Sequence, residues 1–192
     1  AVDIKVLQKY GINFNFILSV GTIEPRKNFK TLILAFDILK KKYKFKNLKL
    51  VIAGKTGWKS EETFDSYNKS KYKEDIIFTG EISDHDLVQL YNTASLFVYP
   101  SIFEGFGFPV LEAMSCGLPV IASGTSSIPE VLQHPDLLFE PFDEKKICIK
   151  MDEILSNDNL SSYIRKQCII NSKKFSWQKT AAETFNVYRN CI

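Results

Sequence analysis

Two carboxylates, Glu104 and Glu112, flank a glycine-rich turn, and this is the part of the sequence best suited to chemistry. Pro109 suits the first turn of a helix and Gly117 suits the position just after its end, so we predict a helix over residues 108–116. Glu104 then lies in the loop before this helix, and Glu112 lies about one turn into it. The turn and the first helical residue are made of Gly105, Phe106, Gly107 and Phe108.

Such a segment is suited to binding a phosphorylated sugar. Its glycines let backbone N–H groups at the helix start face a phosphate, which the helix dipole also favours. A carboxylate that accepts hydrogen bonds from two adjacent hydroxyls is a usual way to hold a ribose or a hexose. The alternative is structural: Glu104 caps the helix and Glu112 is exposed to solvent. The dinucleotide-binding fingerprint is excluded, because Val110 stands where its third glycine belongs.

A second candidate is the loop from Gly21 to Asn28, in which Arg26 and Lys27 come directly before a predicted helix. A helix N-terminus already favours anions, so helix stability does not explain two cations there, whereas a bound phosphate does. The alternative is an exposed basic turn. A Walker A loop is excluded, because its spacing of glycine and lysine is not present.

Short buried strands must position these loops. Six apolar runs are brief, β-branched or aromatic, and nearly continuous, which is typical of strands buried on both faces of a parallel sheet. They are Phe16–Val20, Leu48–Ala53, Ile76–Thr79, Leu96–Tyr99, Pro119–Ala122 and Leu137–Phe139. Ligands of such a sheet bind beyond the carboxyl ends of the strands. Two more loops lie there, at Gly54 and at Gly80 with Ile82, but their glycines can equally serve only a turn or a close backbone approach.

Helical periodicity separates the strands and then replaces them. Helices are predicted over 29–43 and over 83–93, the second with Ser83 as its N-cap. Ser127 and Glu130 have the spacing of a capping box at the start of another helix. The alternation predicts an α/β fold with a Rossmann-like, doubly wound parallel sheet. We divide one domain, 1–192, into a lead-in (1–13), a sheet core (14–142) and a helical part (143–192), with helices near 143–155, 158–173 and 177–190.

Composition excludes several classes of protein. A chain of 192 residues with 45% hydrophobic residues builds one domain with a sizeable core. Its net charge of +3, with no basic stripe among aromatics, argues against nucleic-acid binding. The four cysteines form no C-x-x-C pair, which indicates reduced, mostly buried thiols and a cytosolic compartment. The two histidines lack ligand spacing, so no metal site is predicted, and no apolar run is long enough to span a bilayer.

Four motifs of the sequence resemble those of a known family. The stretch E-G-F-G-F-P-x-L-E-A-M-x-C-G-x-P-V-I-A-S, which begins at Glu104, is similar to the carboxy-terminal domain of retaining GT-B glycosyltransferases of family 4, also called group 1, and in particular to mannosyltransferases. Three further motifs agree in order and spacing: V-G-T-I-E-P-R-K-N (20–28), S-S-I-P-E-V (126–131) and L-L-F-E-P-F-D (137–143). The resemblance covers nearly the whole chain.

The resemblance implies one half of a GT-B fold, in which this domain binds a nucleotide diphosphate sugar. Lys27, with Arg26 beside it, is then expected at the diphosphate, Glu112 at the ribose and Glu104 at the donor sugar as the third catalytic residue. The amides near Gly107 and Phe108 are expected to bind phosphate, and Ile82 to line the base pocket. Gly21, Gly54, Gly80, Gly105 and Phe106 complete the donor-binding set. The family uses no metal or other cofactor.

One departure concerns the first loop, where many relatives carry arginine and this chain has Thr22; Arg26 is the candidate substitute. The P-R-K-N form of the loop favours GDP-mannose as the donor. We expect the acceptor-binding domain, which precedes this one in the family, to lie outside this sequence. We therefore expect the isolated chain to bind nucleotide sugar weakly without turnover.

The resemblance also implies partners and leaves alternatives. A saccharide or lipid-linked acceptor is expected, in polysaccharide assembly in the cytoplasm at the inner face of a membrane, with peripheral membrane association. The last helix, around Trp177 to Tyr188, is expected to pack on the missing domain. The alternatives are a non-catalytic nucleotide- or sugar-binding or regulatory module, and a GT-B epimerase-like enzyme.

Overall fold

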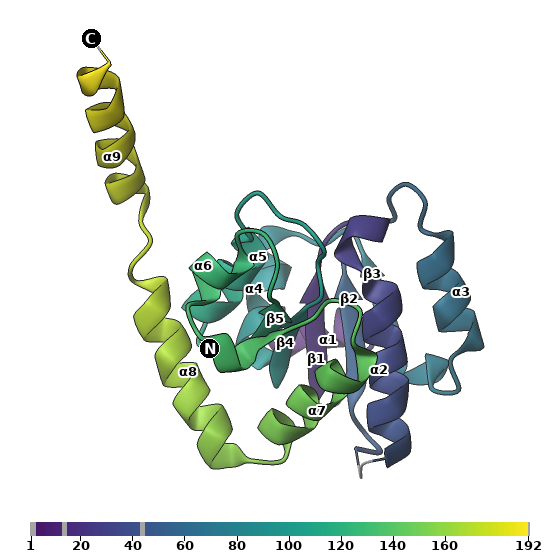
Figure 1. Ribbon diagram of the computed structural model, residues 1–192. Helices are drawn as coiled ribbons and strands as arrows, with labels where there is room; N and C mark the ends of the chain where they lie inside the picture. Colours follow the sequence, from purple (N-terminus) through teal and green to yellow (C-terminus); the bar gives the residue numbers. More distant parts are fainter. Residues whose placement is uncertain (1–2, 13–14, 43–44, 192) are drawn as a thin grey trace.

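The protein is built on a parallel sheet of six strands in the order β3-β2-β1-β4-β5-β6 (Figure 1). The computed structural model describes residues 3–12, 15–42 and 45–191. The strands are β1 (Phe16–Val20), β2 (Lys49–Ala53), β3 (Ile76–Gly80), β4 (Leu96–Tyr99), β5 (Val120–Ser123) and β6 (Leu138–Phe139). Each predicted run is confirmed as a strand, with ends that shift by no more than one residue.

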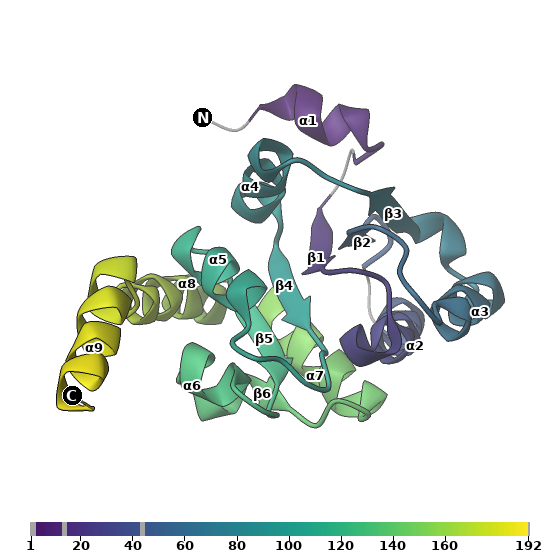
Figure 2. The same cartoon turned by 90° about the horizontal axis from the view of Figure 1, so that it is seen from above.

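Helices cover both faces of the sheet, which confirms the doubly wound architecture (Figure 2). One face carries α1 (Ile4–Lys9), α4 (Asp84–Thr93), α5 (Phe108–Ser115) and α8 (Asp158–Ser172). The other carries α2 (Phe29–Lys42), α3 (Glu61–Lys69) and α7 (Glu144–Leu155). The short α6 (Ile128–Leu132) follows β5, and the 3₁₀ turns η1 (Pro25–Lys27), η2 (Lys73–Asp75) and η3 (Pro135–Leu137) lie in loops.

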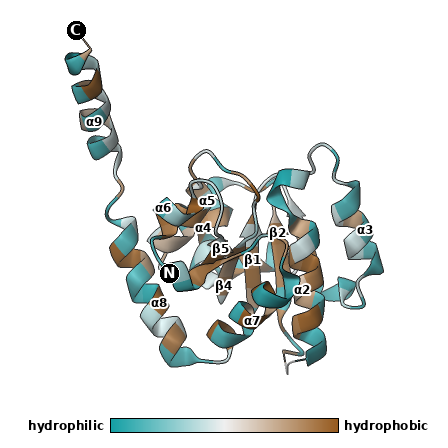
Figure 3. Cartoon of the chain, viewed as in Figure 1, coloured by the Kyte–Doolittle hydropathy of each residue, from teal (hydrophilic) through white to brown (hydrophobic). Residues whose placement is uncertain are grey.

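The core lies on both sides of the central strands. All five residues of β1 and all four residues of β4 and of β5 are buried. Figure 3 shows these strands as a hydrophobic centre beneath helices with mixed surfaces. Burial on both faces explains why the sequence of the strands is continuously apolar instead of alternating.

The order of the sheet reverses between β1 and β4, and this position decides where a site can form. The two strands pair in parallel with Ile17 opposite Leu96 and Leu18 opposite Phe97. The hydroxyl of Ser19 also donates to the carbonyl of Val98 at 2.6 Å. The loops that follow β1 and β4 therefore start side by side, while their helices leave to opposite faces. Open α/β sheets bind ligands at such a switch point.

The predicted capping box at Ser127 is wrong. Ser127 precedes α6 with a helical backbone (φ −81°, ψ −11°), and its side chain forms no capping hydrogen bond. Its hydroxyl donates instead to the carbonyls of Glu104 and Phe106, at 2.9 Å each. The neighbouring loop offers these acceptors at close range, so tertiary contacts override the local capping pattern. The predicted N-cap at Ser83 is confirmed, since its hydroxyl accepts from the amide of Asp86.

Two helices of the structure, α1 and α3, were not among the helices predicted from the sequence. α3 is a polar helix whose single buried residue is Thr63. In the lead-in, α1 packs on α4, where the Lys9 amine lies 2.6 Å from Asp86 Oδ2 and the amide of Asp3 donates to Gln89. The lead-in is thus held against the domain over residues 3–12, and its residues 1, 2 and 13 lie outside the described residues.

The carboxy-terminal part is helical, as predicted. α7 and α8 pack against the body, whereas α9 (Trp177–Asn190) projects away from the sheet and has no buried residue among those described (Figure 1). Within the described chain, none of the helices has the length and apolar character needed to cross a membrane. The four cysteines are free thiols, of which Cys148 and Cys168 are buried, Cys116 is half-buried and Cys191 is exposed.

Candidate functional site

The loops after β1 and β4 bring three predicted site residues into one ion cluster. Lys27 Nζ lies 2.7 Å from Glu104 Oε1, and Arg26 Nη1 lies 2.7 Å from Glu104 Oε2. Arg26 also pairs with Glu24 through Nη2 at 2.7 Å. The Lys27 side chain is only 9% exposed and that of Glu104 11%, so their charges face each other with little water between them. The cluster thus contains two cations, Arg26 and Lys27, and two carboxylates, Glu24 and Glu104.

Two hydroxyls complete the surroundings of Glu104. Oε1 also accepts hydrogen bonds from Ser101 at 2.6 Å and from Tyr99 at 2.8 Å. Burial by itself raises the pKa of Glu104, but the hydrogen bonds from Lys27, Ser101 and Tyr99 outweigh it and lower the pKa to about 2. Glu104 is therefore a carboxylate at neutral pH. It does not cap α5, so the structural alternative for this residue is wrong.

A glycine makes room for the lysine. Gly21 directly follows β1 with φ of +150°, and a Cβ atom there would lie 2.9 Å from Cε of Lys27. A side chain at this position would therefore require the aliphatic part of Lys27 to shift, in a backbone conformation that residues other than glycine rarely adopt. The requirement for glycine at this position thus comes from the packing of the cation.

Asn28 locks the first loop onto two others. It has φ of +55°, a conformation that asparagine tolerates better than most residues. Its buried amide donates to the carbonyls of Pro100 at 3.2 Å and Pro141 at 2.6 Å, and its Oδ1 accepts from Thr31. These hydrogen bonds fix the position of the adjacent Arg26 and Lys27 relative to the loop after β4.

The glycines at the ends of β2 and β3 have a mainly structural role in this arrangement. A Cβ atom at Gly54 would lie 2.2 Å from the carbonyl oxygen of Gly21, so glycine is needed for the approach of the two strand ends. The Gly54 amide donates to the carbonyl of Gly80 at 3.1 Å. Nothing lies within 4 Å of a Cβ at Gly80, and Ile82 packs half-buried at the edge of the core. Gly54 thus joins the end of β2 to the ends of β1 and β3.

The turn before α5 presents backbone donors. Gly107 has φ of +102° and starts the helix without a side-chain cap. Within the described chain, the amides of Gly105, Phe106 and Gly107 donate no hydrogen bond to another protein group. Phe108, the first helical residue, is 49% exposed. The free amides and the start of the helix dipole together favour an anion at this position.

The loop after β5 holds this turn from outside. Ser126 Oγ accepts from the amide of Glu104 at 2.9 Å, and the adjacent Ser127 donates to the carbonyls of Glu104 and Phe106. The position of Glu104 is thus fixed by backbone bonds as well as by its own carboxylate.

Glu112 lies apart from the ion cluster, in an apolar cleft of about 740 Å³ between α4, α5 and the start of α9. The residue is exposed, as the structural alternative has it, but its Oε2 accepts a hydrogen bond from Tyr91 at 2.9 Å. Other lining residues include Leu87, Phe106, Phe108 and Trp177. The structure thus joins Arg26, Lys27 and Glu104 and places Glu112 in a neighbouring cleft.

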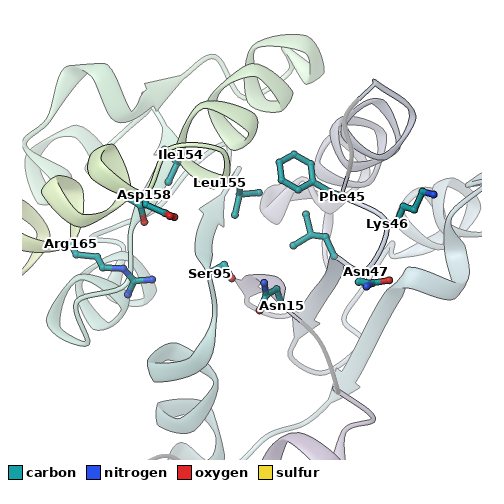
Figure 4. Close-up of a pocket in the computed structure, with 11 residues that line it drawn as sticks. Asn15, Phe45, Lys46, Asn47, Ser95, Ile154, Leu155, Asp158 and Arg165 are labelled. Atoms are coloured by element: carbon teal, nitrogen blue, oxygen red, sulfur yellow. The ribbon is translucent and has the colours of Figure 1, made fainter.

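A larger cleft, of about 980 Å³, lies at the opposite end of the sheet. Figure 4 shows Asn15 and Ser95 on one wall, facing Asp158 and Arg165. Asn15 and Ser95 directly precede β1 and β4, so this cleft is at the amino ends of the strands. It contains no residue of the ion cluster and has no part in the site described here.

The hydroxyl groups of the site, which belong to Tyr91, Tyr99, Ser101 and Ser126, were not predicted from the sequence. A signal existed for the tyrosines, because a tyrosine in a buried strand or on a buried helix face needs a partner for its hydroxyl. The serines carry no such signal. Among the described residues, no group of three His, Cys, Asp or Glu side chains is placed to hold a metal ion.

Comparison with known proteins places these features in a family context. Residues 5–175 match the family described as "Glycosyl transferases group 1". The chain is 35% identical over 185 residues to O-antigen chain mannosyltransferase B of Escherichia coli, covering 96% of this chain and 48% of that protein. It is 38% identical over 177 residues to the serotype-specific mannosyltransferase WbdA of Escherichia coli, covering 90% of this chain and 21% of that protein. The chain thus spans half or less of the length of these relatives.

The fold agrees with that of solved structures. A glycosyltransferase from Rickettsia africae ESF-5 superposes with a TM-score of 0.83 at 21% identity, covering 97% of this chain and 50% of that one. The predicted architecture, one half of a GT-B fold, is therefore confirmed.

Proposed function

The chain belongs to the group 1 glycosyl transferases, and from this membership we propose that it is the donor-binding domain of a retaining enzyme that transfers a hexose from a nucleotide diphosphate sugar. The observation that carries the proposal is the cluster of Arg26, Lys27 and Glu104 beside the free amides of the turn before α5. Cations, amides and a carboxylate meet at the switch point of the sheet, where ligands of this fold class bind.

The diphosphate is assigned to the cations and the amides. Lys27 and Arg26 supply two positive charges, and the amides of Gly105 to Gly107 supply directed donors. A diphosphate bound there replaces Glu104 as the partner of Arg26 and Lys27, both of which pair with Glu104 in the unliganded chain. The exchange frees the Glu104 carboxylate to accept hydrogen bonds from sugar hydroxyls.

The nucleoside is assigned to the apolar cleft that contains Glu112. Glu112 Oε2 is held by Tyr91, and its other oxygen is available for the ribose hydroxyls. Ile82, in the loop that leads into α4, is not among the residues that line this cleft, and its assignment to the base rests on the family resemblance alone. The cleft volume of about 740 Å³ is within the usual range for small-molecule sites.

The chemistry follows from where negative charge develops. As the bond between the anomeric carbon and the diphosphate breaks, charge builds on the leaving oxygen, and Lys27, Arg26 and the start of α5 stabilise it. Each such contact lowers the barrier by roughly 3–4 kcal/mol, by analogy with measured oxyanion donors. With a pKa of about 2 and four hydrogen-bonding partners, Glu104 is suited to position the sugar and is a poor nucleophile or acid. No metal or other cofactor is required in this scheme.

Several parts of the proposal concern the whole enzyme. An acceptor domain is expected to face this one across a cleft, with α9 packing against it, and the acceptor is a saccharide or a lipid-linked saccharide. GDP-mannose is the proposed donor, since the relatives reported above are mannosyltransferases. The proposed setting is the cytoplasm, with peripheral association at the inner face of a membrane. The isolated chain is expected to bind donor weakly without transfer.

The test is calorimetric titration of the chain with GDP, UDP and dTDP and with their hexose conjugates. Glu112→Ala should weaken binding of the free nucleotide and of the nucleotide sugar equally, whereas Glu104→Ala should lower the affinity for the nucleotide sugar relative to that for the free nucleotide. Glu62→Ala, at an exposed position in α3, is the control. If the wild-type chain binds none of the six ligands, the proposal is wrong.

A further inference from the structure

Three aromatic rings connect the two halves of the proposed donor site. The ring of Phe97 lies between those of Tyr91 and Tyr99, with centroid separations of 5.6 Å and 5.8 Å. Phe97 and Tyr99 lie on the same face of β4, and Tyr91 reaches them from α4. All three are at most 2% exposed. Packing this tight fixes the position of each phenol oxygen.

Each tyrosine hydroxyl donates a hydrogen bond to one of the two glutamates of the site. Tyr91 donates to Glu112 Oε2 at 2.9 Å, and Tyr99 donates to Glu104 Oε1 at 2.8 Å. The Tyr99 oxygen also accepts from Lys27 Nζ at 2.7 Å. Tyr99 thus contacts both Lys27 and Glu104 of the ion cluster.

We propose that Tyr91 and Tyr99 are positioning residues of the donor site: Tyr91 orients Glu112 towards the nucleoside, and Tyr99 sets Glu104 and Lys27 relative to the sugar and the diphosphate. The inference rests on the proposed function. Glu112 is exposed on its helix, so without Tyr91 its carboxylate has several accessible rotamers. Glu104 has to release its cations when a ligand binds, and Tyr99 and Ser101 are the partners that keep it in place.

Both tyrosines remain hydrogen-bond donors over the working pH range. Burial, with the nearby carboxylates, raises the pKa of Tyr91 and of Tyr99 well above its usual value. Both phenols therefore keep their protons near neutral pH. The two hydroxyls therefore act through geometry, by donating to carboxylates that bind the ligand.

The test uses Tyr91→Phe and Tyr99→Phe, which keep the rings and remove only the hydroxyls. Affinities for GDP and GDP-mannose are measured by calorimetry in the 192-residue chain. Tyr91→Phe should weaken both ligands equally, by about tenfold, which is the usual effect of losing a hydrogen bond to a charged group. Tyr99→Phe should weaken GDP-mannose by about tenfold and GDP by less. Tyr67→Phe, whose ring packs against Phe78 away from the site, is the control.

For Tyr99→Phe, the ratio of the two affinities separates positioning from general destabilisation, because a purely structural effect lowers the melting temperature and leaves the ratio of GDP to GDP-mannose affinity unchanged. For Tyr91→Phe, where an unchanged ratio is expected, the melting temperature makes the distinction: positioning weakens both ligands at the melting temperature of the control, whereas a structural effect lowers that temperature. If the ratio in Tyr99→Phe equals that of the wild type, or if Tyr91→Phe binds GDP as the control does, the inference is wrong while the proposed function stands. If the wild type binds neither these ligands nor the UDP and dTDP pairs, the proposed function itself fails.

Discussion

Lys27 and Glu104 are separated by 77 residues, yet Lys27 Nζ and Glu104 Oε1 lie 2.7 Å apart. The pair forms because β1 and β4 are neighbours in the sheet and their loops begin at the same level. Proximity in the fold, set by strand order, thus creates the chemistry that the two separate sequence motifs carry.

Replacing the buried cation tests its assignment to the diphosphate. Lys27→Met keeps most of the side-chain volume and should weaken GDP binding by about 10- to 100-fold. The free energy of unfolding should fall by about 1–3 kcal/mol, because Glu104 keeps Arg26, Tyr99 and Ser101 as partners. Calorimetry and urea denaturation measure the two effects.

The matched control for this variant is Lys30→Met, at an exposed ion pair with Glu62 in which the side chains are 49% and 78% exposed. It should change stability by less than about 0.5 kcal/mol and leave GDP binding unaltered. Equal GDP affinities for Lys27→Met and the control would contradict the assignment.

Acid should destabilise the protein through Glu104. The pKa of this carboxyl in the folded chain is about 2, below its ordinary value of 4.5, so the ionised form stabilises the fold. That contribution is complete above about pH 4.5 and is lost as the pH falls towards 2. Its size is on the order of 3 kcal/mol.

The measurement is the free energy of unfolding against pH for the wild type and Glu104→Gln. Asp75 and Asp86 also have lowered pKa values, so the informative quantity is the difference between the two curves. The difference should shrink as the pH falls from 4.5 towards 2. A difference that stays constant over that interval would show that Glu104 has an ordinary pKa.

The space at Gly21 is expected to be essential for the site. In Gly21→Ala the methyl group meets Cε of Lys27 at 2.9 Å, and the backbone has φ of +150°. Stability should fall by about 1–3 kcal/mol, and GDP binding should weaken as the lysine is displaced. In Gly124→Ala, the control, the nearest side-chain atom is Leu138 Cβ at 3.6 Å, an ordinary contact. Loss of stability without loss of GDP affinity in Gly21→Ala would show that the cation does not depend on this glycine.

Two substitutions separate the roles of Asn28. Asn28→Gly keeps the φ of +55° accessible but removes the hydrogen bonds to Pro100, Pro141 and Thr31, at an expected cost of about 2–4 kcal/mol. Asn28→Ala should cost about 1–2 kcal/mol more, because alanine is strained in this conformation. Urea denaturation gives the order, and greater stability of the alanine variant would contradict the backbone argument.

The sequence predicts the elements of the sheet well because their signals are local. Runs such as Phe16–Val20 and Leu96–Tyr99 match their strands residue for residue, since burial on both faces demands uninterrupted apolar side chains. α3 escapes prediction because its apolar face consists only of the half-buried Phe64 and Tyr67, which pack against Phe78. Ser127 shows the limit of local motifs: its capping pattern is present, but carbonyls of a loop more than 20 residues away take the hydroxyl.

The site itself is predictable in its residue types and not in its pairings. The roles of Lys27, Glu104 and Glu112 follow from a family resemblance, and each role remains a prediction for this chain. That Glu104 binds both cations depends on strand order and on the conformation of two loops, which no local pattern encodes. The hydroxyl groups of Tyr91 and Tyr99 become visible only when packing shows where each phenol points.

Because Glu104 pairs with both Arg26 and Lys27, it lowers the net affinity of the two cations for an incoming anion. An incoming anion gains Arg26 and Lys27 only by displacing a carboxylate that already neutralises them. The measured affinity is therefore the difference between the attraction of the cations to the bound anion and their attraction to Glu104. It underestimates how strongly the cations themselves attract an anion. The same competition acts on departure, since Glu104 returns to the cations as the anion leaves, which favours rapid release over tight retention.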